Sequence, residues 1–103
     1  MKFVVVLVTV PYDKSKKIIN LLLTKKLAAC VNKIKTIESF YWWGNKICND
    51  KETLLVIKTK KILFEKIVKE IKKVHPYKVP EIISIEINNG NKEYLDWIKE
   101  VTI

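Results

Sequence analysis

Hydrophobic and polar positions change their spacing several times along the chain, and each change predicts a new element. Residues 2–10 form an almost continuous Val-rich run, which is typical of a strand in the middle of a sheet. Pro11 ends this run, and Asp13 could cap a following helix. In that helix apolar residues recur at the helical spacing up to about Lys26. The chain is therefore expected to begin with a strand and a helix.

Two long strands joined by a tight turn are predicted next. Residues 28–43 are rich in β-branched and aromatic side chains, and an apolar run closes the segment 46–59. Between them, Gly44 and Asn45 tolerate the positive φ of a two-residue hairpin turn. An arm from Ala29 to Trp43 would be about 50 Å long at roughly 3.3 Å per residue. We therefore expect the hairpin to overshoot a small body or to contain a bulge.

A second helix and a fourth strand follow the hairpin. Thr59 could cap the helix, whose apolar stripe runs from Phe64 to Val74 with lysines opposite. His75 and Pro76 stop it. Isoleucines then alternate with polar residues over 83–87, the period of a half-buried strand.

A last amphipathic helix after Gly90 completes the chain, with Tyr94 and Trp97 on its apolar face. The order βαββαβ plus a helix predicts an α+β fold, a ferredoxin-like sandwich with a C-terminal helix and a long hairpin between the second and third strands. The length of 103 residues, 49% of them hydrophobic, fits a single domain over 1–103.

Charge and cysteine content limit the partners and the compartment. The net charge is +9, and all 20 basic residues are lysines scattered along the chain, so specific nucleic-acid recognition, which relies on arginine, is not expected. The apolar run near the start is far shorter than the roughly 20 residues of a membrane span and does not resemble a secretory signal. Only Cys30 and Cys48 could form a disulfide. A cytoplasmic protein with reduced thiols and no membrane partner is expected.

The activities that this fold commonly carries each need residues that the chain lacks. An RNA-recognition motif stacks bases on aromatic side chains of its central strands, but 46–59 contains none. The first strand-to-helix loop has no Cys-x-x-Cys pair for copper transfer, and there is no arginine for an acylphosphatase cradle. Cys30 and His75 could form a nucleophile pair, but no third group orients them. A binding protein is therefore favoured over an enzyme.

Three stretches in order carry a family resemblance. They are Leu27–Asn32, His75–Ile83 with the pattern His-Pro-Tyr-x-x-Pro-Glu, and Gly90–Trp97 with the pattern Gly-Asn-x-x-Tyr-Leu-x-Trp. Together with Ser39, Tyr41, Trp43 and Lys58–Thr59, they resemble the CutA divalent-cation-tolerance family over nearly the whole chain. Gly44 sits one position earlier in the hairpin than is usual there, and the proline common after the cysteine is replaced near Lys35.

The resemblance implies a cytoplasmic homotrimer that is linked to tolerance of divalent cations, with copper binding in some members. The fold is also similar to that of nitrogen-signalling PII proteins, so a small-molecule sensor without a metal role is the alternative function. A labile divalent ion, with copper favoured, is the expected ligand of the first function. Other copies of the chain are its expected partners.

Several residues are candidates for these roles. Cys30, His75 and Glu81 combine thiolate, imidazole and carboxylate, which suit copper or zinc, and the fold has to bring Cys30 to the site, from the same or from a neighbouring subunit. The structural alternative is a buried thiol and a hydrogen-bonded histidine. Lys58 and Tyr77 are expected to line a ligand cleft. The remaining candidates, assigned to a trimer interface because one subunit could hardly bury three rings, are Tyr41, Trp42 and Trp43.

Overall fold

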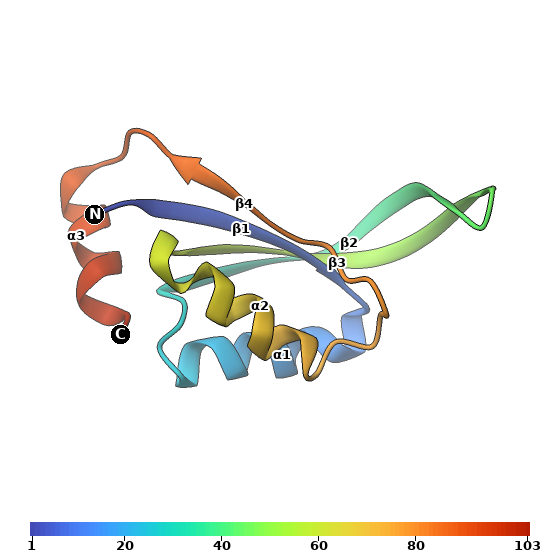
Figure 1. Cartoon of the computed structure of the whole chain (residues 1–103), viewed down its shortest axis with the longest axis horizontal. Coiled ribbons are helices and arrows are strands. Elements are labelled where there is room, and N and C mark those ends of the chain that lie inside the picture. Colours follow the sequence, from blue (N-terminus) through green and yellow to red (C-terminus); the bar gives the residue numbers. More distant parts are fainter.

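The computed structural model describes all 103 residues and shows a four-stranded antiparallel sheet with three α-helices. The strand order is β2-β3-β1-β4, which confirms the ferredoxin-like α+β prediction. Figure 1 shows α1 and α2 below one face of the sheet and α3 at the end away from the hairpin tip. The elements are β1 (Phe3–Val10), α1 (Tyr12–Thr24), β2 (Cys30–Trp43), β3 (Lys46–Lys60), a 3-10 turn (Lys61–Leu63), α2 (Phe64–Lys72), β4 (Ile82–Ile87) and α3 (Lys92–Val101).

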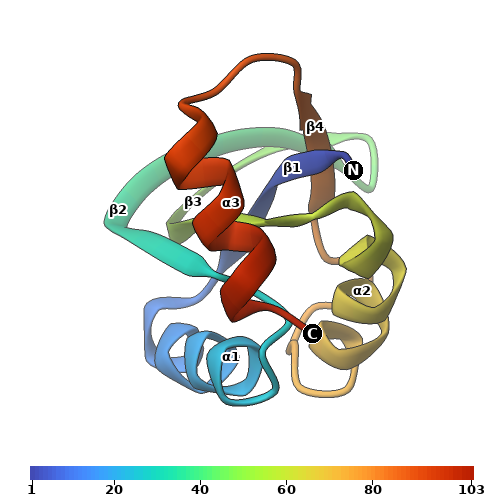
Figure 2. The same cartoon turned by 90° about the vertical axis from the view of Figure 1, so that its left-hand side faces the viewer.

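Only one face of the sheet is covered by α1 and α2. Alternate residues of β1, from Val4 to Val10, are buried and pack in one core with side chains of both helices, such as Leu22 and Ile67. The residues between them in β1, Val5 and Leu7, are only half-buried on the other face. The continuous apolar run of β1 was interpreted as a strand in the middle of a sheet. The structure confirms that position. On the second face, which we call the open face, helical cover is limited to α3 at the end away from the hairpin, where the ammonium of Lys60 donates to the carbonyl of Ile103 at 2.8 Å; Figure 2 views the molecule from that end, with α3 in the foreground.

The hairpin of β2 and β3 projects beyond the body, as Figure 1 shows, and the molecule measures 44 Å along its longest axis. Gly44 and Asn45 both have positive φ, at 57° and 61°, which confirms the predicted two-residue turn. The register of β2 against β3 shifts between Ile34 and Ile37, so the expected bulge is present. The hydroxyl of Thr53 fastens the bulge by donating to the carbonyl of Lys35 at 2.7 Å.

Two helix starts differ from the sequence-based expectation. Thr59 does not cap a helix, because it lies buried in β3 and its hydroxyl donates to the carbonyl of Leu27 at 2.5 Å. The chain instead enters α2 through the short 3-10 turn. Asp13 lies in the first turn of α1, where a carboxylate suits the helix dipole, while Pro11 holds the N-cap position.

The helix α1 ends at Thr24 in a Schellman motif, two residues before the expected end. The N–H of Leu27 donates to the carbonyl of Leu22 at 2.9 Å, and that of Lys26 donates to Leu23 at 3.1 Å. Such a motif needs a left-handed residue, which is most often glycine. Here Lys26 takes that place with a φ of 56°, so the sequence contained no signal for it.

Replacing Lys26 with glycine is expected to stabilise the protein by about 1 kcal/mol, because glycine adopts a left-handed φ without the steric cost that lysine pays. The melting temperature of a domain of this size should rise by about 4–8 °C. Thermal unfolding monitored by circular dichroism measures the shift. Lys17→Gly, at an exposed position inside the same helix, is the control and should lower stability by a similar amount. A loss of stability in Lys26→Gly would contradict the assigned strain.

Candidate functional site

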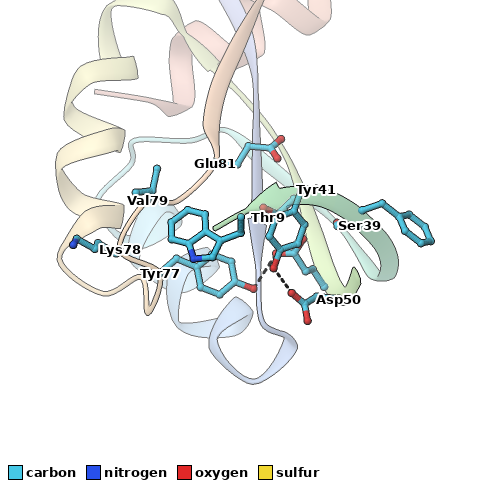
Figure 3. Close-up of a pocket in the computed structure, with 11 residues that line it drawn as sticks. Thr9, Ser39, Tyr41, Asp50, Tyr77, Lys78, Val79 and Glu81 are labelled. Atoms are coloured by element: carbon cyan, nitrogen blue, oxygen red, sulfur yellow. Dashed lines mark hydrogen bonds between the residues drawn. The ribbon is translucent and has the colours of Figure 1, made fainter. Parts of the chain in front are cut away.

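A pocket of about 590 Å³ lies at the hairpin end of the open face. Strands β1, β2 and β3 and the loop before β4 all contribute to it, and Figure 3 shows their side chains converging. Its volume is in the range of small-molecule sites. The lining residues are Thr9, Ser39, Phe40, Tyr41, Trp43, Asp50, Glu52, Tyr77, Lys78, Val79 and Glu81.

Strand alternation explains why polar groups meet here. In β3 the helix-covered positions include Thr53 and Leu55, so Glu52 falls on the open face, where it is only 8% exposed. In β1, Thr9 follows Val5 and Leu7 on the same face and is also buried. Glu52 and Thr9 therefore form the inner part of the pocket.

Two tyrosines hold the carboxylates of β3. The hydroxyl of Tyr77 donates to Glu52 at 2.9 Å, and the hydroxyl of Tyr41 donates to Asp50; Figure 3 shows both bonds. Burial, reinforced by the bond to Glu52, raises the pKa of Tyr77. The hydrogen bond to Asp50 raises the pKa of Tyr41 to about 12. Both hydroxyls therefore remain protonated donors at physiological pH.

His75 lies behind the pocket and positions the loop that carries Tyr77. Its Nε2 lies 2.8 Å from the carbonyl oxygen of Thr9, just beyond Val8 and Ile82, the last pair between β1 and β4. Its Nδ1 accepts the backbone N–H of Tyr77 at 3.1 Å, and the two rings are 4.8 Å apart. Because a carbonyl can only accept, Nε2 is the nitrogen that donates, and Nδ1, which accepts the Tyr77 N–H, is the acceptor. Both ring nitrogens are thus already engaged.

Cys30 and Lys58 lie at the other end of the sheet, beside α3. They face each other across β2 and β3, and the ammonium of Lys58 donates to the side chain of Asn32. Burial, with the Cys30 thiol as a further cause, raises the pKa of Tyr94 in α3. Lys58 and Glu52 are six residues apart in β3, roughly 20 Å by strand geometry.

The predicted site residues are therefore brought together only in part. Glu81 and Tyr77 line the pocket and His75 lies behind it, whereas Cys30 and Lys58 of the same chain do not reach it. No three His, Cys, Asp or Glu side chains of the chain cluster closely enough to hold a metal ion. The donor set Cys30, His75 and Glu81 thus does not fit a metal within one subunit.

The three adjacent aromatic residues of the hairpin do not act as one group. Tyr41 and Trp43 line the pocket, whereas Trp42 pairs with Ile47 across the hairpin, does not line the pocket, and is 71% exposed. The sequence pattern did not identify Asp50 and Glu52 as pocket residues. The predicted turn at Gly44 and Asn45 could have revealed Asp50, because counting the cross-strand pairs outward from the turn places Asp50 opposite Ser39.

Apolar side chains continue from the pocket along the open face. In β4, Ile83 and Ile85 are 48% and 56% exposed, opposite Leu7 and Val5 of β1. In β2, Ile34 is also exposed. An uncovered apolar sheet face of this kind is typical of an interaction surface.

The fold and the site define a class: a small ferredoxin-like α+β protein with a ligand-sized pocket beside an uncovered sheet face. The family model described as CutA1 divalent ion tolerance protein matches residues 4–101. The chain therefore belongs to the CutA1 family, which confirms the sequence-based resemblance.

Relatives and solved structures agree with this assignment. The divalent-cation tolerance protein CutA of Thermus thermophilus is 43% identical over 99 residues, which cover 95% of this chain and 96% of that protein. The chloroplastic protein CutA 1 of Oryza sativa is 44% identical over 96% of this chain, which spans only 56% of that longer protein. The crystal structure of CutA1 from Oryza sativa matches with a TM-score of 0.96 at 42% identity, covering 100% of this chain and 95% of that one.

The compartment is not assigned by family membership. One relative is named chloroplastic, and a structure from Archaeoglobus fulgidus with a TM-score of 0.93, 40% identical and covering 96% of this chain and 97% of that one, is described as periplasmic. None of the helices here has the length and apolar character needed to cross a bilayer. The cytoplasmic location stays a prediction.

Proposed function

We propose that the chain is a homotrimeric binding protein that contributes to divalent-cation tolerance. It acts by binding a ligand and not as an enzyme, and a neighbouring subunit closes its pocket. The observation that carries this proposal is the position of the pocket, which adjoins the uncovered apolar part of the open face. A subunit seated on that face would cover the pocket mouth and the isoleucines together. The pocket would then become an inter-subunit cleft.

Physical chemistry supports a closed assembly. Full burial of an isoleucine side chain contributes about 1.5–3 kcal/mol, and Ile34, Ile83 and Ile85 are all exposed on the single subunit. The exposed Trp42 and Ile47 near the hairpin tip add further apolar area. A closed ring covers such surfaces without leaving one free to propagate a fibre. The number three rests on the resemblance to the CutA family.

Light scattering at micromolar concentration tests this proposal. The expected mass is three times the subunit mass of 12.1 kDa. A mass of one subunit would contradict both the assembly and the inter-subunit cleft.

A copper site shared between subunits is a second candidate function. Cys30 is half-exposed, with weak contacts to Asn32 at 4.0 Å and to Tyr94, and the Glu81 carboxylate is paired with no lysine of its own chain, so both can still donate to a metal ion. Thiolate and carboxylate from different subunits could meet at the covered face. His75 could join them only by giving up its bond to the Tyr77 N–H.

Copper titration followed by calorimetry separates this candidate from a metal-free role. Wild type should bind copper saturably, Cys30→Ser should lose the binding, and Cys48→Ser should keep it. Affinity should fall as pH falls, because ligation requires the thiol to release its proton. Equal binding by wild type and Cys30→Ser would remove Cys30 from the site.

The size and lining of the pocket favour a third candidate, a small-molecule sensor. A pocket of about 590 Å³ with four aromatic rings is far larger than one metal ion needs and is suited to an organic ligand. In this function a small molecule would stabilise the trimer while metal ions alone would not. Thermal unfolding with and without chelator distinguishes the small-molecule sensor from a metal-binding protein.

A further inference from the structure

The pocket has the opposite charge to the rest of the chain. The protein as a whole carries a net charge of +9, yet the pocket is lined by Asp50, Glu52 and Glu81 against a single lysine, Lys78. Figure 3 shows the Lys78 side chain with its nitrogen directed away from Tyr41 and Asp50. A local excess of carboxylates in a lysine-rich protein attracts cations and repels anions.

Glu52 is a buried carboxyl group without a basic side chain as partner. Its side chain forms no ion pair, and its only hydrogen bond is the one that Oε1 accepts from the hydroxyl of Tyr77. No buried side-chain nitrogen or oxygen of the protein lacks a partner, so the free Oε2 of Glu52 reaches open space, and Glu52 lines the pocket. A buried carboxylate without a cation costs free energy that a bound cation would recover.

Aromatic side chains share the pocket with this carboxylate. Tyr77 contacts it directly, and Tyr41 and Trp43 line the same pocket from β2. The faces of such rings attract organic cations, most strongly when water is excluded. A small metal ion instead needs several close oxygen, nitrogen or sulfur ligands, and no three acidic, histidine or cysteine side chains cluster here.

From these observations we propose that the pocket binds a small aliphatic amine in its ammonium form. The ammonium group pairs with Glu52, the alkyl chain lies against the aromatic rings, and a second ammonium group of a diamine pairs with Asp50 or Glu81 nearer the mouth. This inference rests on the proposed function in taking the pocket as the ligand site. It adds the chemical class of the ligand, which a trimer or a copper site does not define.

Isothermal titration of the wild-type protein at low ionic strength tests the inference with matched probes. Butylamine and the diamine putrescine are the cationic probes, butanol is the neutral isostere and butyrate is the anionic one. Putrescine should bind more tightly than butylamine, and both should bind at least about tenfold more tightly than butanol or butyrate, since a charge-assisted bond contributes about 1.5–3 kcal/mol. Added salt should weaken the binding of the amines.

The variant Glu52→Gln isolates the charge, because glutamine keeps the shape of the side chain and can still accept the bond from Tyr77. It should weaken amine binding about tenfold or more and leave butanol unaffected. Glu65→Gln removes one negative charge from the exposed face of α2, remote from the pocket, and should bind amines like wild type. Trp43→Leu should weaken tetramethylammonium more than butanol.

Each outcome decides the inference separately from the assembly. A protein that forms trimers but binds amines no better than butanol, or equally well as Glu52→Gln, overturns the inference and leaves the proposed function intact. A single-subunit protein that still binds putrescine through Glu52 supports the inference and overturns the trimer. Saturation by copper or magnesium alone, with the same dependence on Glu52, would assign the pocket to a metal ion and overturn the amine.

Discussion

Replacing Ile85 with aspartate is expected to leave the subunit folded and to prevent its assembly. Ile85 is 56% exposed in the single subunit, so a polar side chain costs little in folding. Under a neighbouring subunit the same change would remove about 1.5–3 kcal/mol of apolar burial at every interface and add an unpaired buried carboxylate, which costs several kcal/mol more. Light scattering should show single subunits, while the circular dichroism spectrum stays that of wild type.

The control lies next to Ile85 on the same strand. Ser84 is also exposed, but strand alternation directs it away from the open face. Ser84→Asp should therefore assemble like wild type. If Ile85→Asp keeps the mass of the wild-type assembly, the open face of β4 is not buried between subunits, and the proposed closure of the pocket is wrong.

Replacing His75 with alanine is expected to lower the free energy of unfolding by about 2–4 kcal/mol. The imidazole is buried, its Nε2 bonds the carbonyl of Thr9, and its Nδ1 accepts the N–H of Tyr77. Alanine leaves both backbone groups without that partner and opens a cavity behind the pocket. Urea unfolding at one fixed protein concentration measures the loss, because the stability of an assembly depends on concentration.

A second variant separates the role of the His75 imidazole from that of the Tyr77 hydroxyl. Tyr77→Phe keeps the aromatic contact with His75 and removes only the hydroxyl that bonds Glu52, so its cost should be about 1 kcal/mol. If the urea concentration at the unfolding midpoint of His75→Ala equals that of wild type within error, the imidazole does not support the pocket. A loss in Tyr77→Phe as large as that in His75→Ala would attribute the effect to Glu52 instead.

Local patterns were sufficient to predict the order of the elements. Gly44 and Asn45 are residue types whose backbone tolerates the positive φ of the turn, and the length of the arms implied a bulge because a small body cannot support them straight. The left-handed Lys26 had no such local signal. Core packing of Leu22 and Leu27 around it imposes the conformation against the preference of lysine.

The candidate site was harder to predict because it depends on contacts between distant parts of the chain. His75 bonds Thr9, which lies 66 positions earlier, and Tyr77 bonds Glu52, which lies 25 positions earlier. Neither pairing leaves a trace in local hydrophobic periodicity. The signature around His75 located one wall of the pocket, but the carboxylates of β3 emerged only when the sheet register placed them opposite that wall.

The bulge in β2 shifts the alternation of side chains between the two faces of the sheet by one residue. Before it, Ile34 lies opposite Leu54 and even-numbered side chains share the open face; after it, Ile37 lies opposite Glu52 and odd-numbered side chains do. One unpaired residue thereby selects Tyr41 and Trp43 for the pocket. The lining of the pocket is encoded as much by the number of residues in β2 as by their identity, and such a count is free to change in evolution by a single insertion or deletion.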